Sequence, residues 1–156
     1  MLTPSQYAAV GRLALSFNEI EYAFEVYIAY LLGAPNWGIS VLLAEEGMFR
    51  QKAERFDKIL DAISKESDIL FAQITPIRQW VKRAKQLAEH RNQYVHALAV
   101  HDFGTNVTRL RMRGTEREFD EAEINNLAAE AAVLVGQLHT HCGDLLVMIE
   151  DVRGAK

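Results

Sequence analysis

Three polar side chains that suit acid–base chemistry stand close together in the stretch AEHRNQYVHALAV, residues 88–100. They are Arg91, Asn92 and His96. An imidazole transfers protons near neutral pH, a guanidinium binds anions, and an amide can orient either group. The residues around them otherwise have the composition of an apolar helix. Two explanations stay open: these groups tie a helical bundle together, or they carry out catalysis.

Capping signals and helical periodicity define the elements that must position these side chains. Thr3, Pro4 and Gln6 supply an N-cap, a proline at the first helical position and a capping-box partner. The first helix should therefore run to about residue 32, where GAPNWG stops it. A second helical region, broken near Gly47, should cover roughly residues 39–65.

The second half of the chain contains two further helix signals. Thr75 and Pro76 repeat the cap-plus-proline pattern, which predicts a third long helix to about residue 99, carrying Arg91, Asn92 and His96. Asp120 and Glu123 form the capping signature of a last helix that should end near residue 152.

Alternating residues predict a strand in VTRLRMR, residues 107–113, paired across a turn with LAVHD. One side of that strand would present Arg109, Arg111 and Arg113. No repeat, linker or low-complexity segment divides the chain. We therefore expect residues 1–156 to form a single all-α domain, an up-and-down bundle of about four long helices with a small β-hairpin inserted before the last helix.

Two apolar seams each contain one charged residue. The seam of the first helix contains Glu21, and that of the third contains Arg91. Because a charge that faces a core must be paired or reach water, we expect Glu21 and Arg91 to meet across packed helices. In the alternative, one helix is slightly rotated and the charge lies at the rim of the bundle. Asn92 and His96 share another helix face, which Lys85 and Glu89 continue toward the N-terminus.

Hydrophobic residues make up 49% of the chain, which is enough for a core of its own. Cys142 is the single cysteine, which indicates a reducing, cytoplasmic setting. No stretch of 18 uncharged residues could span a membrane, so we expect a soluble protein. The net charge is −4, yet residues 78–117 carry +6 and the remainder −10. That basic segment could attract a polyanion or be merely solvated surface. His139 and His141 point to different sides of a helix, so we expect no metal site, and no cofactor motif is present.

Arg91, Asn92 and His96 match the R-x4-6-H signature, in its R-N-x-x-x-H form, of the HEPN superfamily. That superfamily groups small helical bundles of toxin–antitoxin, phage-abortive and CRISPR-associated systems. SFNEIEYAFEVYIAYLLG, residues 16–33, also resembles the first helix of its bacterial members. The resemblance covers most of the chain loosely, and the motif alone matches residue by residue.

The resemblance implies a metal-independent endoribonuclease, for example a toxin or defence component, that acts as a homodimer with both motifs lining one cleft. His96 would be the acid or base, Arg91 would stabilise the phosphorane, and Asn92 would orient the phosphate or the imidazole. Glu21 would support the site, and RNA would contact Lys85 and the three strand arginines, Arg109, Arg111 and Arg113. Alternatively, the bundle is catalytically silent and serves as a nucleotide-binding or dimerisation module that binds an antitoxin or a nucleotidyltransferase, or it is a purely structural dimer.

Overall fold

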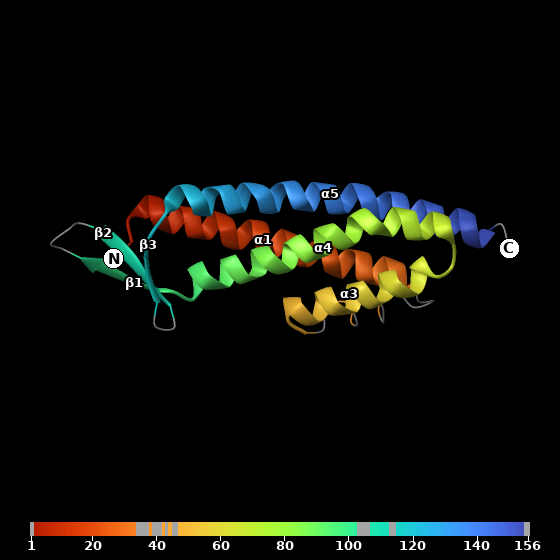
Figure 1. Ribbon diagram of the computed structural model, residues 1–156, viewed down its shortest axis with the longest axis horizontal. Helices are drawn as coiled ribbons and strands as arrows, with labels where there is room; N and C mark the ends of the chain where they lie inside the picture. The colour runs from red at the N-terminus through yellow and green to blue at the C-terminus, as the bar shows by residue number, and fades with distance from the viewer. Residues whose placement is uncertain are drawn as a thin grey trace.

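The computed structural model describes residues 2–33, 38, 42, 44, 47–102, 107–112 and 115–154; the side chains of residues 98–102, 112 and 115 are not described. The described residues form an all-α bundle with a small sheet at one end (Figure 1). The helices are α1 (Pro4–Leu32), α3 (Phe49–Ser64), α4 (Asp68–Val95) and α5 (Glu121–Gly154). The predicted fold class is therefore confirmed, with the sheet inserted before the last helix.

Helices α1 and α5 begin where the local capping signals place them. Thr3 Oγ1 accepts a hydrogen bond from the Gln6 N–H, and the Gln6 side chain accepts one from the Thr3 N–H. Gly33 ends α1 with a left-handed φ of 54°, a conformation that glycine adopts without strain. Asp120 Oδ1 accepts a hydrogen bond from the Glu123 N–H at 3.0 Å at the start of α5.

Helix α3 confirms the second half of the predicted region 39–65, while most of residues 39–46 lie outside the described residues. Gly47 has a φ of 95°, which L side chains rarely adopt, so the predicted break at this glycine is confirmed. Directly after it, the Gln51 side chain accepts a hydrogen bond from the Met48 N–H and helps to fix the start of α3.

The predicted start of the third helix at Pro76 is wrong, because α4 begins at Asp68 and carries Pro76 in its interior. Ser67 caps the helix by accepting hydrogen bonds from the N–H groups of the two residues that follow Asp68. The first turns of α4 bury Leu70 and Ile74 in the core. We infer that this burial outweighs the backbone hydrogen bond that a proline removes.

Helix α4 also ends earlier than predicted, at Val95, because the chain turns at His96 into the first strand. The strands β1 (Leu98–Asp102), β2 (Val107–Met112) and β3 (Thr115–Glu118) form an antiparallel sheet in the order β1-β2-β3. The predicted hairpin is confirmed, with Leu98 opposite Arg111 and Asp102 opposite Val107. The third strand was not predicted.

The core runs along the length of the bundle between the long helices. Helices α1 and α5 lie side by side over most of their lengths, and α4 packs against both (Figure 1). An apolar seam of α5 belongs to this core, because Ile124, Ala131, Leu138 and Leu145 are fully buried. Cys142 is buried in the same seam, and this burial raises the pKa of its thiol to about 12.

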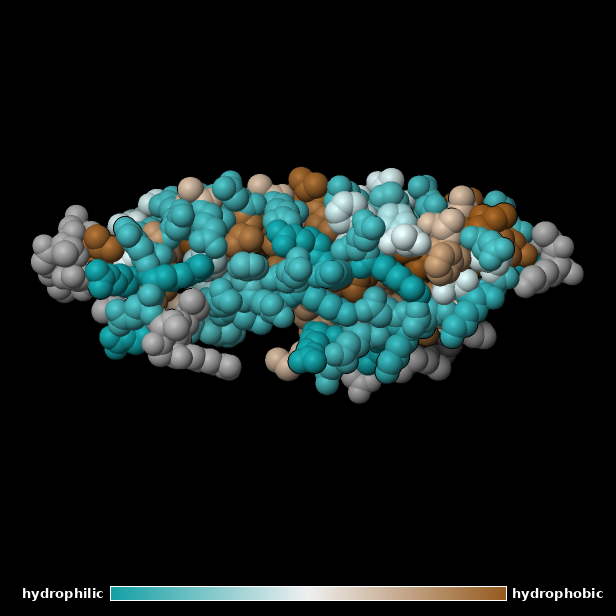
Figure 2. Space-filling view, in the orientation of Figure 1, coloured by the Kyte–Doolittle hydropathy of each residue, from teal (hydrophilic) through white to brown (hydrophobic). Residues whose placement is uncertain are grey.

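Hydrophobic side chains also reach the surface of α5. Figure 2 shows mainly hydrophilic side chains over α3 and α4, and hydrophobic ones along α5 and near the C-terminal end. A window of α5 has a mean hydropathy of 1.3, so by length and composition this helix could cross a membrane. Core helices of soluble proteins meet the same criterion, and one side of α5 is buried against the other long helices.

Candidate functional site

Arg91 lies at the edge of the core near the end of α4. The buried residues of this part of the helix are Leu87 and Tyr94, whereas Ala88 is half-buried and Val95 is exposed. The apolar face is thus rotated by about one residue from the predicted seam. Arg91 is half-buried as a result, which is the rim position of the alternative prediction.

The guanidinium of Arg91 contacts one amide and one aromatic ring. Its Nη1 donates a hydrogen bond to Asn92 Oδ1 at 2.9 Å, and its Cζ lies 5.6 Å from the centroid of the Phe17 ring. Its Nε is buried and has no hydrogen-bond partner among the described residues. Because Nε is enclosed, the hydrogen-bonding capacity that Arg91 keeps for an anion is that of its outer nitrogens, Nη1 and Nη2.

The predicted ion pair between Glu21 and Arg91 is wrong. The carboxylate of Glu21 accepts a hydrogen bond from Lys52 Nζ at 2.8 Å, and the same Nζ also bonds to Glu25. Lys52 is only 5% exposed. Burial alone lowers the pKa of Lys52, but the hydrogen bonds and charges of the two glutamates outweigh it and raise this pKa above its ordinary value. The partner of Glu21 thus comes from α3, whereas the prediction paired the seams of the first and third helices only.

Asn92 and His96 are both exposed. His96 lies just after α4, where φ and ψ of −102° and 3° end the helical geometry, and its N–H still donates to the Asn92 carbonyl at 3.1 Å. The side chain of His96 has no hydrogen bond or ion pair within the part of the chain that the structure describes. The imidazole is therefore available to a ligand or a second protein.

A pocket of about 780 Å³ lies beside Arg91, between α1, the start of α3 and the second half of α4. Beyond the start of α3, the last turns of α4 continue toward the sheet (Figure 1). His96 is not among the residues that line the pocket. Those residues are Phe17, Glu21, Met48, Phe49, Arg50, Glu54, Lys85, Ala88, Glu89, Arg91 and Asn92.

The pocket thus brings together four of the predicted site residues, namely Glu21, Lys85, Arg91 and Asn92. Sequence reasoning missed its apolar wall, to which Met48 and Phe49 belong, and it missed Lys52 as the partner of Glu21. Phe49 stood in the sequence at helical spacing with other apolar residues, so the pattern indicated a core position and gave no sign of a pocket.

Ion pairs neutralise much of the basic segment 78–117. Lys85 pairs with Asp57, and Arg83 forms a two-pronged contact with Glu130, in which Nη2 and Oε2 are 2.6 Å apart. Three further arginines of the segment, Arg78, Arg111 and Arg117, are paired with Asp61, Glu116 and Glu123. Five of the nine basic residues of the segment are therefore paired, each with an acidic residue of another element.

On the sheet, Arg109 and Arg111 are exposed on the face opposite the buried Thr108 and Leu110, as the alternation predicted. Glu118 stands opposite Arg109 across β2 and β3, and Arg111 Nε donates to Glu116 at 2.7 Å. Arg113 lies outside the described residues. The strand thus presents arginines whose charges are partly compensated.

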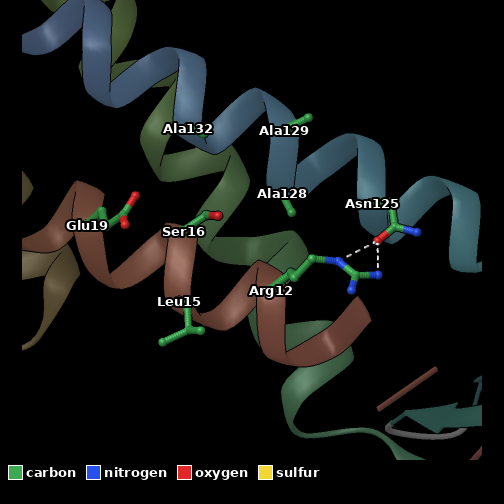
Figure 3. A pocket seen from close by; sticks show the side chains of 8 residues that line it. All are labelled: Arg12, Leu15, Ser16, Glu19, Asn125, Ala128, Ala129 and Ala132. Atoms are coloured by element: carbon green, nitrogen blue, oxygen red, sulfur yellow. Dashed lines mark hydrogen bonds between the residues drawn. The ribbon is translucent and has the colours of Figure 1, made fainter. Parts of the chain in front are cut away.

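A second, shallower groove of about 560 Å³ lies between α1 and α5. Figure 3 shows Arg12 reaching from α1 to Asn125 on α5, with the hydrogen bonds from Nε and Nη2 to Oδ1 measuring 3.2 and 2.8 Å. The rest of the lining consists of three alanines of α5 together with Leu15, Ser16 and Glu19 of α1. This groove lacks the combination of imidazole, guanidinium and amide found at the end of α4.

The other histidines and aromatic residues with described contacts have structural partners. His139 Nδ1 lies 2.7 Å from the Tyr27 hydroxyl, and the His141 ring stacks on Trp80. Tyr94 is buried, as a core position predicts, with the Arg117 guanidinium 4.3 Å above its ring. Within the described residues no cluster of three or more histidine, cysteine, aspartate or glutamate side chains could hold a metal ion.

Comparison with known proteins finds no matching family model, no matching curated protein and no matching solved structure.

Proposed function

We propose that this protein is a metal-independent endoribonuclease of the HEPN type, with Arg91, Asn92 and His96 as its catalytic residues. The state of Arg91 carries the proposal: within the described residues its guanidinium has no carboxylate partner, and its buried Nε has no hydrogen bond. Arg91 lines the pocket, so a phosphate bound there can accept hydrogen bonds from the outer nitrogens of the guanidinium, whereas the enclosed Nε is out of reach. Asn92 is exposed next to Arg91, and His96 is exposed just after the last turn of α4, so the core requires neither.

These residue types suit the cleavage of RNA by its own 2′-hydroxyl. His96 would take the proton of the 2′-hydroxyl while the 2′-oxygen attacks phosphorus, or give a proton to the 5′-oxygen as the P–O5′ bond breaks. Arg91 would stabilise the charge of the phosphorane, and Asn92 would keep its hydrogen bond to Arg91 Nη1 and so orient the guanidinium. The products would carry a 2′,3′-cyclic phosphate and a 5′-hydroxyl.

The reaction needs one base and one acid, whereas each chain supplies one motif histidine, His96, just after the last turn of α4. A homodimer in which both motifs line one cleft would supply the second imidazole. His96 is exposed at the end of α4 with no partner among the described residues, so it is accessible to a second copy of the chain.

RNA contacts by Lys85, Arg109 and Arg111 stay a prediction. All three lie on the surface or at the pocket, but Asp57, Glu118 and Glu116 stand beside them. Their contribution to RNA affinity should therefore be smaller than that of Arg91.

The pairing of basic residues with acidic ones favours a second candidate function, a catalytically silent HEPN bundle that binds an antitoxin or a nucleotidyltransferase. Its support is that five of the nine basic residues of the segment are paired and the whole chain carries a net charge of −4, which does not favour a polyanion.

The test is incubation of the purified protein with mixed RNA in EDTA. Wild-type protein should produce 2′,3′-cyclic phosphate ends, and His96→Ala should abolish them. Because His96 is exposed, its removal should change the unfolding free energy by only about 0.5 kcal/mol. Asn92→Ala should keep the fold and slow cleavage.

Matched controls are available on α5, where His141→Ala and Asn126→Ala remove the same side-chain types away from the motif. Both controls should cleave RNA like the wild type. Unchanged cleavage by folded His96→Ala would refute the mechanism. Absence of cleavage by the wild type across many RNAs would favour the partner-binding module.

A further inference from the structure

Among the residues that the structure describes, two charged side chains of the pocket beside Arg91 form no ion pair. Four of its six charged residues are already paired with neighbours: Glu21, Arg50, Glu54 and Lys85. Within the described residues, Glu89 and Arg91 are the two that remain. The pocket therefore has one free negative charge and one free positive charge.

A ligand that satisfies both must combine two kinds of group. Arg91 needs an acceptor, and a phosphate oxygen is the strongest acceptor that matches a guanidinium. Glu89 is exposed, so its carboxylate can accept hydrogen bonds from neighbouring N–H donors. The two residues are two positions apart and point to different sides of α4, yet both line the pocket, so one ligand can contact both only if it spans the helix face between them, as a base and a phosphate of one nucleotide would.

The rest of the lining suits a flat apolar body. Met48 is 79% exposed at the pocket. Phe49 is half-buried, because its ring stacks on Phe24 at 5.4 Å and meets Phe17 edge-on at 4.8 Å. A volume of about 780 Å³ is within the range of nucleotide-sized ligand sites.

We propose that this pocket binds the guanine base of a nucleotide whose phosphate lies at Arg91. Guanine is the RNA base with two adjacent donors on its pairing edge, N1–H and the 2-amino group, and a carboxylate accepts both at once. Adenine and cytosine place an acceptor nitrogen beside their amino group, and uracil offers one N–H between two carbonyl oxygens. Met48 and Phe49 would pack against the ring.

The guanine nucleotide can come from two sources, an RNA chain or a free mononucleotide. In RNA, the guanosine would lie next to the cleaved bond and set the cutting preference, and this part rests on the proposed function. Free mononucleotides are not cleaved by the proposed reaction. Their binding is therefore an independent readout of the pocket.

The experiment measures binding of guanosine, adenosine, cytidine and uridine 3′- and 5′-monophosphates by calorimetry. The guanosine forms should bind about tenfold more tightly than the others, a ratio typical of a two-bond contact to a base edge. Glu89→Gln should remove this preference. Met48→Glu should weaken all the nucleotides, because it places a charge against the ring.

The matched control is Glu150→Gln, which changes an exposed glutamate near the far end of α5. It should keep both affinity and preference. A short RNA with one guanosine, tested beside the mononucleotides, separates the two sources: tighter binding of the RNA indicates a chain, and equal binding indicates a free nucleotide.

The outcomes also separate this inference from the proposed ribonuclease. If the wild type cleaves RNA but Glu89→Gln leaves the base preference unchanged, the guanine pocket is wrong and the ribonuclease stands. If guanosine monophosphate binds in a Glu89-dependent way and no RNA is cleaved, the pocket stands and the ribonuclease fails. Equal binding of all four bases to the wild type overturns the inference.

Discussion

Arg91 is half-buried, and its contribution to the free energy of unfolding depends on its contacts with Asn92 and Phe17. The motif made Arg91, Asn92 and His96 predictable as a group, because their types and spacing are visible in the sequence. The partner of Glu21 was not predictable in the same way. Lys52 lies 31 positions away on α3, and no periodicity within one helix shows which neighbouring helix supplies a counter-charge.

The first prediction concerns the stability of Arg91→Ala. Since Lys52 neutralises Glu21, removing Arg91 leaves no buried carboxylate unpaired. The loss is limited to the contact with the Phe17 ring and the hydrogen bond to Asn92, together about 1 kcal/mol. Urea unfolding of the two proteins measures the difference. A loss of 3–5 kcal/mol, typical of a broken buried pair, would contradict this assignment of partners.

At the scale of elements, helix boundaries set by local capping residues were predicted well. Boundaries set by packing against distant parts of the chain were not. The starts of α1 and α5 followed from capping residues within three positions of one another. The start of α4 was misplaced because the proline signal at Pro76 is ambiguous: a proline fits the first turn of a helix but is also tolerated further in when the flanking turns are buried. The third strand is short and polar, so its alternation gave no apolar pattern.

Lys52 connects α3 to α1, and its removal is the second prediction. Lys52→Met leaves Glu21 and Glu25 side by side, partly buried and without their shared cation. The unfolding free energy should fall by about 3–5 kcal/mol. Lys58→Met on the same helix is the matched control, because Lys58 is exposed and should change stability by less than about 0.5 kcal/mol. Equal effects of the two substitutions would show that the ion pairs add nothing.

The third prediction is the pH dependence of this connection. The pKa of Lys52 is raised in the folded protein, so the folded state holds this proton more tightly than the unfolded chain does. The contribution of Lys52 is therefore complete below its ordinary pKa of about 10.5 and is lost as pH rises above that value. Unfolding free energies between pH 9 and 12 should fall more steeply for wild type than for Lys52→Met. Parallel curves would exclude the linkage.

For the whole molecule, charge compensation between elements predicts a weak salt dependence of RNA binding. If all nine basic residues of segment 78–117 contacted phosphates, the logarithm of affinity would fall with that of salt with a slope of about −6 per chain. Because five of the nine are paired, at most four remain for phosphate contacts, so we expect a slope no steeper than about −3, of which Arg91 supplies about −0.7. Arg91→Ala should flatten the slope, whereas Arg111→Ala should leave it nearly unchanged. A steep slope in the wild type would mean that RNA displaces the internal ion pairs.

The last prediction is assembly, because the proposed reaction would take its acid and its base from two chains. Light scattering at micromolar concentration should give the mass of a dimer, with the motif ends of both α4 helices beside the two-fold axis. Dilution below the dissociation constant should lower the cleavage rate per chain together with the mass, since a separated chain retains one His96. His96→Ala, which removes an exposed side chain, should still dimerise, so loss of cleavage in this variant reports on chemistry and not on assembly. A monomer with full cleavage activity would exclude a shared site and require a single chain to supply both proton transfers.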